Sequence, residues 1–141
     1  MNEGKSVRAV VFGKAGCDKC AVLKKRVDAC VQKECADRVE CVYVDVETVD
    51  GLVAFCRAEC LNPQRIPALM LDVWNPEMKR YAPIPRPTAE SEPSDSLRLH
   101  RILGLQTDYT DRGRGVITPR AIRDEIRLAL QSVEALAPLL R

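Results

Sequence analysis

Residues 7–20 read VRAVVFGKAGCDKC, and this stretch decides the fold. Its first six residues are mostly apolar and β-branched, which is typical of a buried strand. Gly13 and Gly16 interrupt the run. Apolar residues then recur at three- and four-residue spacing as far as Cys35, which predicts a helix over 18–35. A pair of cysteines therefore lies between a strand and the first turn of a helix.

The position of Cys17 and Cys20 suits redox chemistry. Unpaired backbone N–H groups and the helix dipole favour an anion at a helix start, and they lower the pKa of a thiol there. Two intervening residues allow the thiols to close a small disulfide ring. We expect Cys17 to be the exposed attacking thiol and Cys20, one turn further on, to be the buried resolving thiol. Lys14 and Lys19 add favourable charge for a thiolate, whereas Asp18 opposes it.

The rest of the chain alternates between apolar runs and helical patterns. Three further strands are predicted, at 39–46, at 66–74 and at 97–103 before Gly104. A helix capped by Thr48 or Asp50 is predicted up to Asn62-Pro63, with an apolar face formed by Leu52, Val53, Phe55, Cys56 and Cys60. A last helix begins at Thr118-Pro119.

Residues 75–96 differ from the rest of the chain, because they hold five of its nine prolines. We interpret them as a long exposed loop, with the end of a strand near 79–84. The predicted order is β-α-β-α-β-β-α, a single α/β domain over 1–141 with a central mixed four-stranded sheet flanked by helices. The first three strands are joined by helices and are therefore expected to be mutually parallel. The fourth is expected to pair antiparallel at one side.

This order resembles the thioredoxin-like superfamily, and the short N-terminus resembles its glutaredoxin-type core. The resemblance rests on VRAVVF, CDKC opening a helix, VYVDV, RIPALML, and a strand ending at Gly104 before a final helix. It implies that the peptide bond before Pro67 is cis and that Pro67 lies beside the thiol pair. It also implies that Ile66 offers backbone hydrogen bonds to a bound peptide or glutathione.

Three departures from the family pattern affect function. The motif reads CDKC rather than the Cys-Gly-Pro-Cys of thioredoxins or the Cys-Pro-Tyr-Cys of many glutaredoxins. Val11 stands where thioredoxins carry a buried acid that accepts a proton. Residues 104–108, GLQTD, match only in part the region where glutaredoxins hold glutathione. The electron donor that reduces this protein therefore stays open.

Composition narrows the class of protein. The 22 basic and 20 acidic side chains give a net charge of +2, so charge offers no reason to expect nucleic acid or an anionic membrane as partner. No run approaches the roughly 20 apolar residues that span a bilayer. The seven cysteines are an odd number, and the chain begins without an apolar signal segment. We therefore expect a cytoplasmic protein rather than a secreted disulfide scaffold.

We interpret the remaining cysteines first as packing residues. Cys30, Cys41 and Cys56 lie on predicted apolar faces and are expected to pack as small hydrophobes, while Cys35 is expected to be partly exposed near a helix end. Cys56 and Cys60 share a helix face. Two alternatives stay open for this pair: an extra resolving or regulatory thiol at Cys60, or a four-thiolate metal site with the CDKC cysteines.

The leading hypothesis is a thiol–disulfide oxidoreductase that uses Cys17 and Cys20, with Ile66 and Pro67 positioning the substrate. It requires no cofactor. Its expected substrates are protein or glutathione disulfides, and its electron donor is an unidentified reductase or glutathione. The alternatives are a non-catalytic thioredoxin-like binding or redox-sensing module and a thiolate metal-binding protein.

Overall fold

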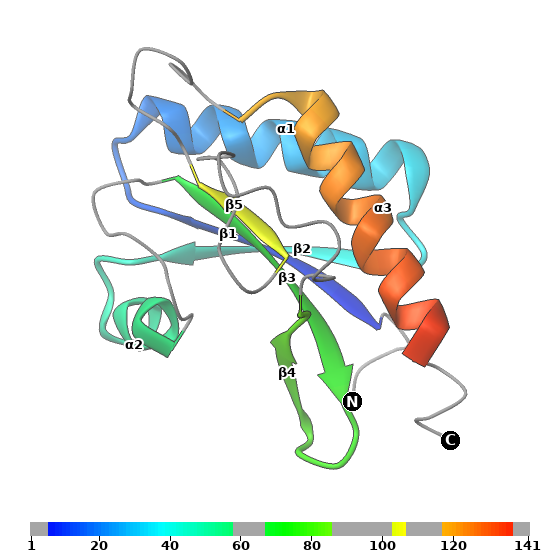
Figure 1. Cartoon of the computed structure of the whole chain (residues 1–141). Helices are drawn as coiled ribbons and strands as arrows, with labels where there is room; N and C mark the ends of the chain where they lie inside the picture. The colour runs from blue at the N-terminus through cyan, green and yellow to red at the C-terminus, as the bar shows by residue number, and fades with distance from the viewer. Residues whose placement is uncertain (1–5, 58–66, 86–102, 107–116, 137–141) are drawn as a thin grey trace, which may run out of the picture.

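The computed structural model describes residues 6–57, 67–85, 103–106 and 117–136. Its elements are drawn in Figure 1. In chain order they are β1 (Val7–Gly13), α1 (Asp18–Glu34), β2 (Val39–Asp45), α2 (Val49–Arg57), β3 (Ala68–Asn75), β4 (Arg80–Pro83), β5 (Gly104–Gln106) and α3 (Pro119–Leu136). The predicted strand–helix–strand start and the Thr118-Pro119 helix start are confirmed. In the described part of the chain, no helix is both long and apolar enough to cross a membrane.

One mixed sheet holds all five described strands, in the order β2-β1-β3-β4, with β5 also paired to β3. Strands β1 and β2 are parallel, from Val7 beside Val39 to Gly13 beside Asp45. Strand β3 is antiparallel to β1, and its first residue, Ala68, lies beside Phe12. Strands β4 and β5 both pair antiparallel with β3. The mixed sheet is confirmed, with one strand more than the four predicted.

The expectation that the first three strands are mutually parallel is wrong for β3. A helix between two strands makes them parallel only when it carries the chain back along the sheet. The nine residues of α2 span about 14 Å at 1.5 Å per residue. Strand β3 then starts beside Phe12, at the edge where β1 ends, and it therefore runs in the opposite direction.

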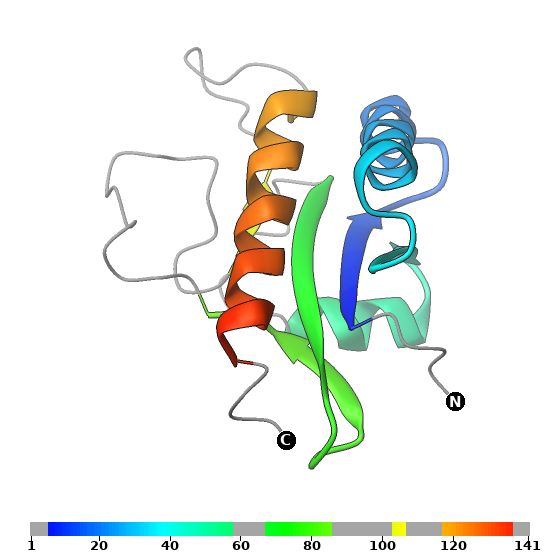
Figure 2. The ribbon, with the colours of Figure 1, turned by 90° about the vertical axis from the view of Figure 1, so that its right-hand side faces the viewer.

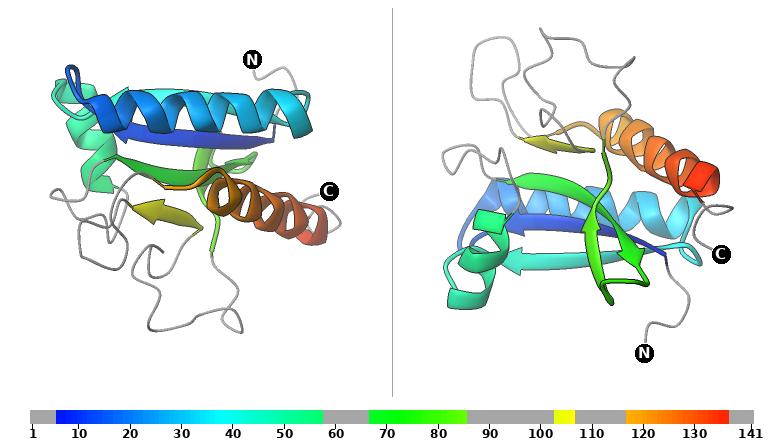
Figure 3. Two further views of the ribbon diagram at one scale, coloured as in Figure 1. Left: turned by 90° about the horizontal axis from the view of Figure 1, so that it is seen from above. Right: turned by 60° about the horizontal axis from the view of Figure 1, so that its bottom comes forward.

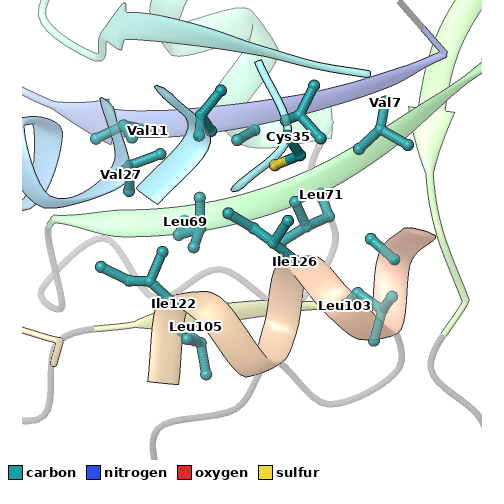
Figure 4. Close-up of a cluster of buried hydrophobic side chains, with 14 of the residues drawn as sticks. Val7, Val11, Val27, Cys35, Leu69, Leu71, Leu103, Leu105, Ile122 and Ile126 are labelled. Carbon is teal, nitrogen blue, oxygen red and sulfur yellow. The ribbon is translucent and has the colours of Figure 1, made fainter. Parts of the chain in front are cut away.

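The two faces of the sheet bury different amounts of apolar surface. Helices α1 and α3 cover one face and α2 lies on the other (Figures 1 and 2). The main core lies between the sheet and α1 and α3 (Figure 4). It includes Val7, Val11, Leu23, Val27, Leu69, Leu71, Ile122 and Ile126. A smaller core on the α2 side holds Val10, Phe12, Ala68 and Met70.

Helices α1 and α3 bury the faces that their spacing predicts. Leu23, Val27 and Val31 of α1 are buried, as are Ile122, Ile126 and Ala129 of α3. Seen from above in Figure 3, these two helices lie along the same side of the sheet. At the end of α1, Cys35 is only 2% exposed and belongs to the main core, so the prediction of partial exposure is wrong. Its backbone N–H caps the helix by donating to Val31 O, which turns the side chain inward.

Among the residues of α2 whose burial the structure describes, 49–54, the small ones are buried or half-buried and the large ones are exposed. Gly51 is buried and Ala54 packs against the smaller core, whereas Leu52 and Val53 are 52% and 45% exposed. The prediction of Leu52 and Val53 on a buried face is therefore wrong. A Cβ on Gly51 would collide with the backbone carbonyl of Asp45, so glycine is what allows α2 to lie against the end of β2. The side chains of Phe55, Cys56 and Cys60 lie outside the described residues.

The segment predicted as a loop over 75–96 is partly a hairpin. Asn75 ends β3, a turn with Lys79 at φ +54 follows, and β4 returns beside β3 as far as Pro83. The Asn75 side chain accepts hydrogen bonds from the N–H groups of Glu77 and Met78, which stabilises the turn. Residues 86–96 and most of the strand predicted at 97–103 lie outside the described residues. Leu103 is buried and precedes β5.

Candidate functional site

The end of β1 and the start of α1 build the site. Strand β1 ends at Gly13, and a short turn leads to Gly16, whose φ of +76 is a conformation that glycine adopts without strain. Cys17 is the N-cap of α1, with an extended backbone at φ −97 and ψ 110. Its Sγ accepts a hydrogen bond from Cys20 N at 3.1 Å. The sulfur thus takes the place that a serine or aspartate oxygen often fills at a helix start.

Cys17 and Cys20 are joined by a disulfide, with their Cα atoms 5.2 Å apart. Cys17 is half-buried, whereas Cys20 has no exposed surface. The first backbone N–H groups of α1 point toward Cys17, so an anionic sulfur formed there on reduction is stabilised by these groups and by the helix dipole. The arrangement can therefore present one sulfur to a partner and keep the other sheltered.

Around Cys20 the packing is tight. A Cβ placed on Gly13 would lie 2.6 Å from Tyr43 Oη, 2.8 Å from Cys20 Cβ and 3.0 Å from Cys20 Sγ. The Tyr43 hydroxyl donates a hydrogen bond to Lys14 O at 3.3 Å. Tyr43 reaches this point from β2, where it is the register partner of Val11. The absence of a side chain at Gly13 therefore leaves room for both the Tyr43 hydroxyl and Cys20 on this side of the strand.

A methyl group at Gly13 is expected to destabilise the oxidised protein. Gly13→Ala places a carbon against Cys20 Cβ, which the disulfide and α1 hold in place, and we expect the free energy of unfolding to fall by about 2 kcal/mol. Chemical denaturation measures it.

Gly16→Ala is the matched control, because its Cβ would meet nothing within 4 Å and only the positive φ is unfavourable. We expect that variant to lose about 1 kcal/mol. If Gly13→Ala were as stable as the parent, the close packing of Cys20 and Tyr43 around Gly13 would be contradicted.

Sequence reasoning did not find Tyr43. Its place follows from the register of the parallel pair, because residues of β1 and β2 that lie side by side point to the same face, and the sequence does not set that register. Val11, the position at which the family carries an acid, is fully buried in the main core. Tyr43 lies next to it, half-buried, and supplies a polar group at the same end of the sheet.

The other predicted site residues divide between described and undescribed parts of the chain. Pro67 is buried and directly precedes Ala68, the register partner of Phe12, which places it at the sheet edge where the disulfide loop begins. Lys14 and Lys19 are exposed on either side of Cys17 in the chain. Ile66 lies outside the described residues, and its substrate contacts stay a prediction, as does the cis bond to Pro67.

Cys30, Cys35 and Cys41 are free thiols that pack in or against the main core. Burial raises the pKa of Cys30 to about 11 and that of Cys41 to about 12, so both thiols are neutral and unreactive at neutral pH. Within the described ranges, no three His, Cys, Asp or Glu side chains come together as a metal site. The proposed four-thiolate set also needs Cys56 and Cys60, whose side chains lie outside those ranges.

Asp72 is a buried acid that sequence reasoning also missed. It is 8% exposed on β3, and its Oδ1 has no hydrogen-bond partner. Its register partners are Arg8 and Pro83. The Arg8 guanidinium bonds Glu40 at 3.1 Å and lies over the Tyr81 ring at 3.8 Å. Burial raises the pKa of Asp72 to about 6, with Arg8 opposing the rise.

Asp72 does not take the place of the missing acid beside Cys20. It alternates with Leu71 and Val73 of the main core, so its side chain points to the α2 face of the sheet, where it lines a groove with Val10 and Met70. Cys20 lies on the opposite face with α1. The sheet therefore separates Asp72 from the disulfide.

The strand order β2-β1-β3-β4, with β1 and β2 parallel and β3 antiparallel, carries a CxxC disulfide at the start of α1. The fold class predicted from the sequence, a mixed sheet flanked by helices with a CxxC pair at a helix start, is therefore confirmed. No protein-family model matches the chain, and no curated protein matches it either.

The solved structures similar to the chain include the following three. Chloroplastic thioredoxin z is 15% identical, with a TM-score of 0.49 over 90% of this chain and 80% of that chain. The poxviral disulfide oxidoreductase G4, described as essential for cytoplasmic disulfide bond formation, is 18% identical, with a TM-score of 0.37 over 86% of this chain and 92% of that chain. A malarial protein is 17% identical, with a TM-score of 0.36 over 47% of this chain and 67% of that chain.

Proposed function

We propose that the protein is a thiol–disulfide oxidoreductase whose working group is the Cys17–Cys20 pair. The observation that carries the proposal is the asymmetry of the disulfide at the N-terminus of α1. Cys17 is accessible and lies at the positive end of the helix, and Cys20 is sheltered one turn further on. This is the arrangement that two-step disulfide exchange requires.

In the reductive direction, the Cys17 thiolate attacks one sulfur of a substrate disulfide. A mixed disulfide forms, the substrate S–S bond breaks, and the first substrate sulfur leaves as a thiolate. The Cys20 thiolate then attacks Cys17 Sγ, which releases the second substrate thiolate and forms the Cys17–Cys20 disulfide. The substrate gains two electrons and the protein loses two, and the reverse sequence oxidises a substrate dithiol.

The same proposal also covers the residues that position the substrate, those that favour the Cys17 thiolate, the substrates and the electron donor. Ile66 and Pro67 position an extended substrate segment, and Lys14 and Lys19 favour the Cys17 thiolate electrostatically. The substrates are protein or glutathione disulfides in the cytoplasm, and a reductase or glutathione returns the pair to the dithiol. The burial of Pro67 at the edge of the sheet where the disulfide loop begins supports its part in this assignment.

A redox titration followed by mass spectrometry tests the proposal. We expect Cys17 and Cys20 to interconvert reversibly between dithiol and disulfide. In the reduced protein at neutral pH, we expect iodoacetamide to modify Cys17 far faster than Cys35, because burial raises the pKa of Cys35 and removes it from solvent. The proposed function would be excluded if the Cys17–Cys20 disulfide did not form and break reversibly, or if Cys17 and Cys35 were modified at the same rate.

One observation favours the alternative, a thioredoxin-like binding or sensing module. Cys20 is fully buried, and Val11, the position at which thioredoxins carry a buried acid, supplies no carboxylate to take its proton. If Cys20 attacked the mixed disulfide only slowly, the domain would stay bound to its partner or report its redox state, and it would not turn over substrate. Turnover of insulin disulfides or of a glutathione mixed disulfide at ordinary enzymatic rates would exclude the sensor.

A further inference from the structure

Cys20 needs a polar neighbour to do its part in disulfide exchange. It has no exposed surface, and burial disfavours the thiolate form of a cysteine. Its attack on the mixed disulfide nevertheless requires that form. Two buried residues of the same elements, Val11 of β1 and Leu23 of α1, are apolar and offer it no hydrogen bond.

The Tyr43 hydroxyl is the polar group at this point. Its oxygen lies 2.6 Å from the position that a Gly13 Cβ would take, and Cys20 Sγ lies 3.0 Å from the same position. Its hydrogen bond to Lys14 O, at 3.3 Å, is longer than the usual 2.7–2.8 Å of a hydroxyl donor. The hydroxyl proton can therefore turn toward a better acceptor without losing a strong bond.

We propose that Tyr43 is a positioning residue for Cys20: its hydroxyl donates a hydrogen bond to the Cys20 sulfur in the mixed disulfide and so stabilises Cys20 as the anion that attacks Cys17. This inference rests on the proposed function. In the oxidised protein the Cys20 sulfur carries no charge, and the hydroxyl then donates to Lys14 O, as the structure shows.

The electrostatic surroundings make Tyr43 a donor and not a base. Burial raises the pKa of Tyr43, and Asp45 on β2 raises it further, while Lys24 on α1 lowers it. The hydroxyl therefore keeps its proton at neutral pH. A neutral O–H that donates to a thiolate stabilises the anion without taking a proton itself, and the proton of Cys20 leaves to solvent or to the departing substrate thiolate.

Tyr43→Phe removes the hydroxyl and keeps the ring. We expect the second step, the release of reduced substrate from the mixed disulfide at pH 7, to slow about tenfold. The first step, formation of the mixed disulfide, is expected to be unchanged. Acid-quenched mass spectrometry of a single turnover with a disulfide peptide resolves the two steps. In the Cys17→Ala background, the ¹³Cβ signal of Cys20 followed against pH is expected to titrate about one pH unit higher when Tyr43→Phe is added than when Tyr43 is retained.

Tyr81→Phe is the matched control. Tyr81 lies on β4, and its ring contacts Arg8 and Trp74, contacts that phenylalanine retains. We expect this variant to match the parent in both steps. The inference is wrong if Tyr43→Phe leaves the second step and the Cys20 titration unchanged while the parent protein turns over. A parent protein that never cycles between dithiol and disulfide would instead overturn the proposed function. A Tyr43→Phe variant that is less stable but resolves the mixed disulfide at the parental rate would show a structural role only, and the inference would also fail.

Discussion

Replacing Cys17 with serine is expected to abolish disulfide exchange, with a fall of at least about a thousandfold in the rate of disulfide reduction. A serine hydroxyl stays protonated at neutral pH and does not attack a disulfide, whereas the thiolate form of a cysteine does. The loss is chemical and not structural. Cys17 is the N-cap of α1 and accepts a hydrogen bond from Cys20 N, and serine is among the most favourable N-cap residues.

Two companion variants sharpen this experiment. Cys20→Ser is expected to retain the first step and to accumulate one equivalent of mixed disulfide on Cys17, because the resolving thiol is missing. Cys30→Ser is the control, since Cys30 is a free, partly buried thiol whose high pKa keeps it neutral, and we expect parental rates. Substantial reduction by Cys17→Ser, or no trapped species with Cys20→Ser, would contradict the assignment of roles.

The second large effect concerns stability and Asp72. Its carboxyl is 8% exposed, and burial raises its pKa from 3.8 to about 6. A native state that holds a proton more tightly than the unfolded chain loses stability as the pH rises. The stabilising contribution of the protonated form is complete below about pH 3.8 and is lost as the pH passes through about 6. One pKa unit corresponds to about 1.4 kcal/mol, so ionised Asp72 costs the fold about 3 kcal/mol.

Asp72→Asn removes this charge at nearly constant volume. We expect the variant to be more stable than the parent by about 3 kcal/mol at pH 8 and to approach it below pH 4. Urea denaturation across this pH range measures the difference, which isolates Asp72 from every other titrating group. Glu77→Gln is the control, an exposed carboxyl in the turn between β3 and β4, and its curve is expected to run parallel to that of the parent. A constant difference between parent and Asp72→Asn at all pH values would contradict an ionised buried Asp72.

Asp72 and Tyr43 could not be predicted from the sequence for the same reason. Each depends on which side chains of neighbouring strands face one another, and register is a property of strand pairing. The run ALMLDVW looks apolar on both faces, and only the pairing with Arg8 and Pro83 shows that Asp72 is enclosed. Likewise, the Tyr43 hydroxyl and Cys20 both lie beside Gly13 only because β2 pairs with β1 from Val7 to Gly13 and Gly13 has no side chain.

The elements that depend on residues close together in the chain, by contrast, could be predicted from the sequence. The strand, the glycines and the helix of residues 7–35 follow from β-branched runs, a positive φ at Gly16 and an N-cap at Cys17, all of which are decided by residues close together in the chain. The start of α3 at Pro119 has the same local basis, because Thr118 Oγ1 accepts from Ala121 N. That Cys20 is more deeply buried than the half-buried Cys17 follows from one turn of helix.

The sequence alone therefore determined that a cysteine pair opens a helix after a buried strand, because capping and periodicity act over a few residues. Tertiary structure decided what surrounds that pair. The direction of β3, the burial of Cys35 and Asp72 and the position of Tyr43 beside Gly13 all depend on segments distant in the chain. Their energies come from close packing between elements, which no local pattern encodes.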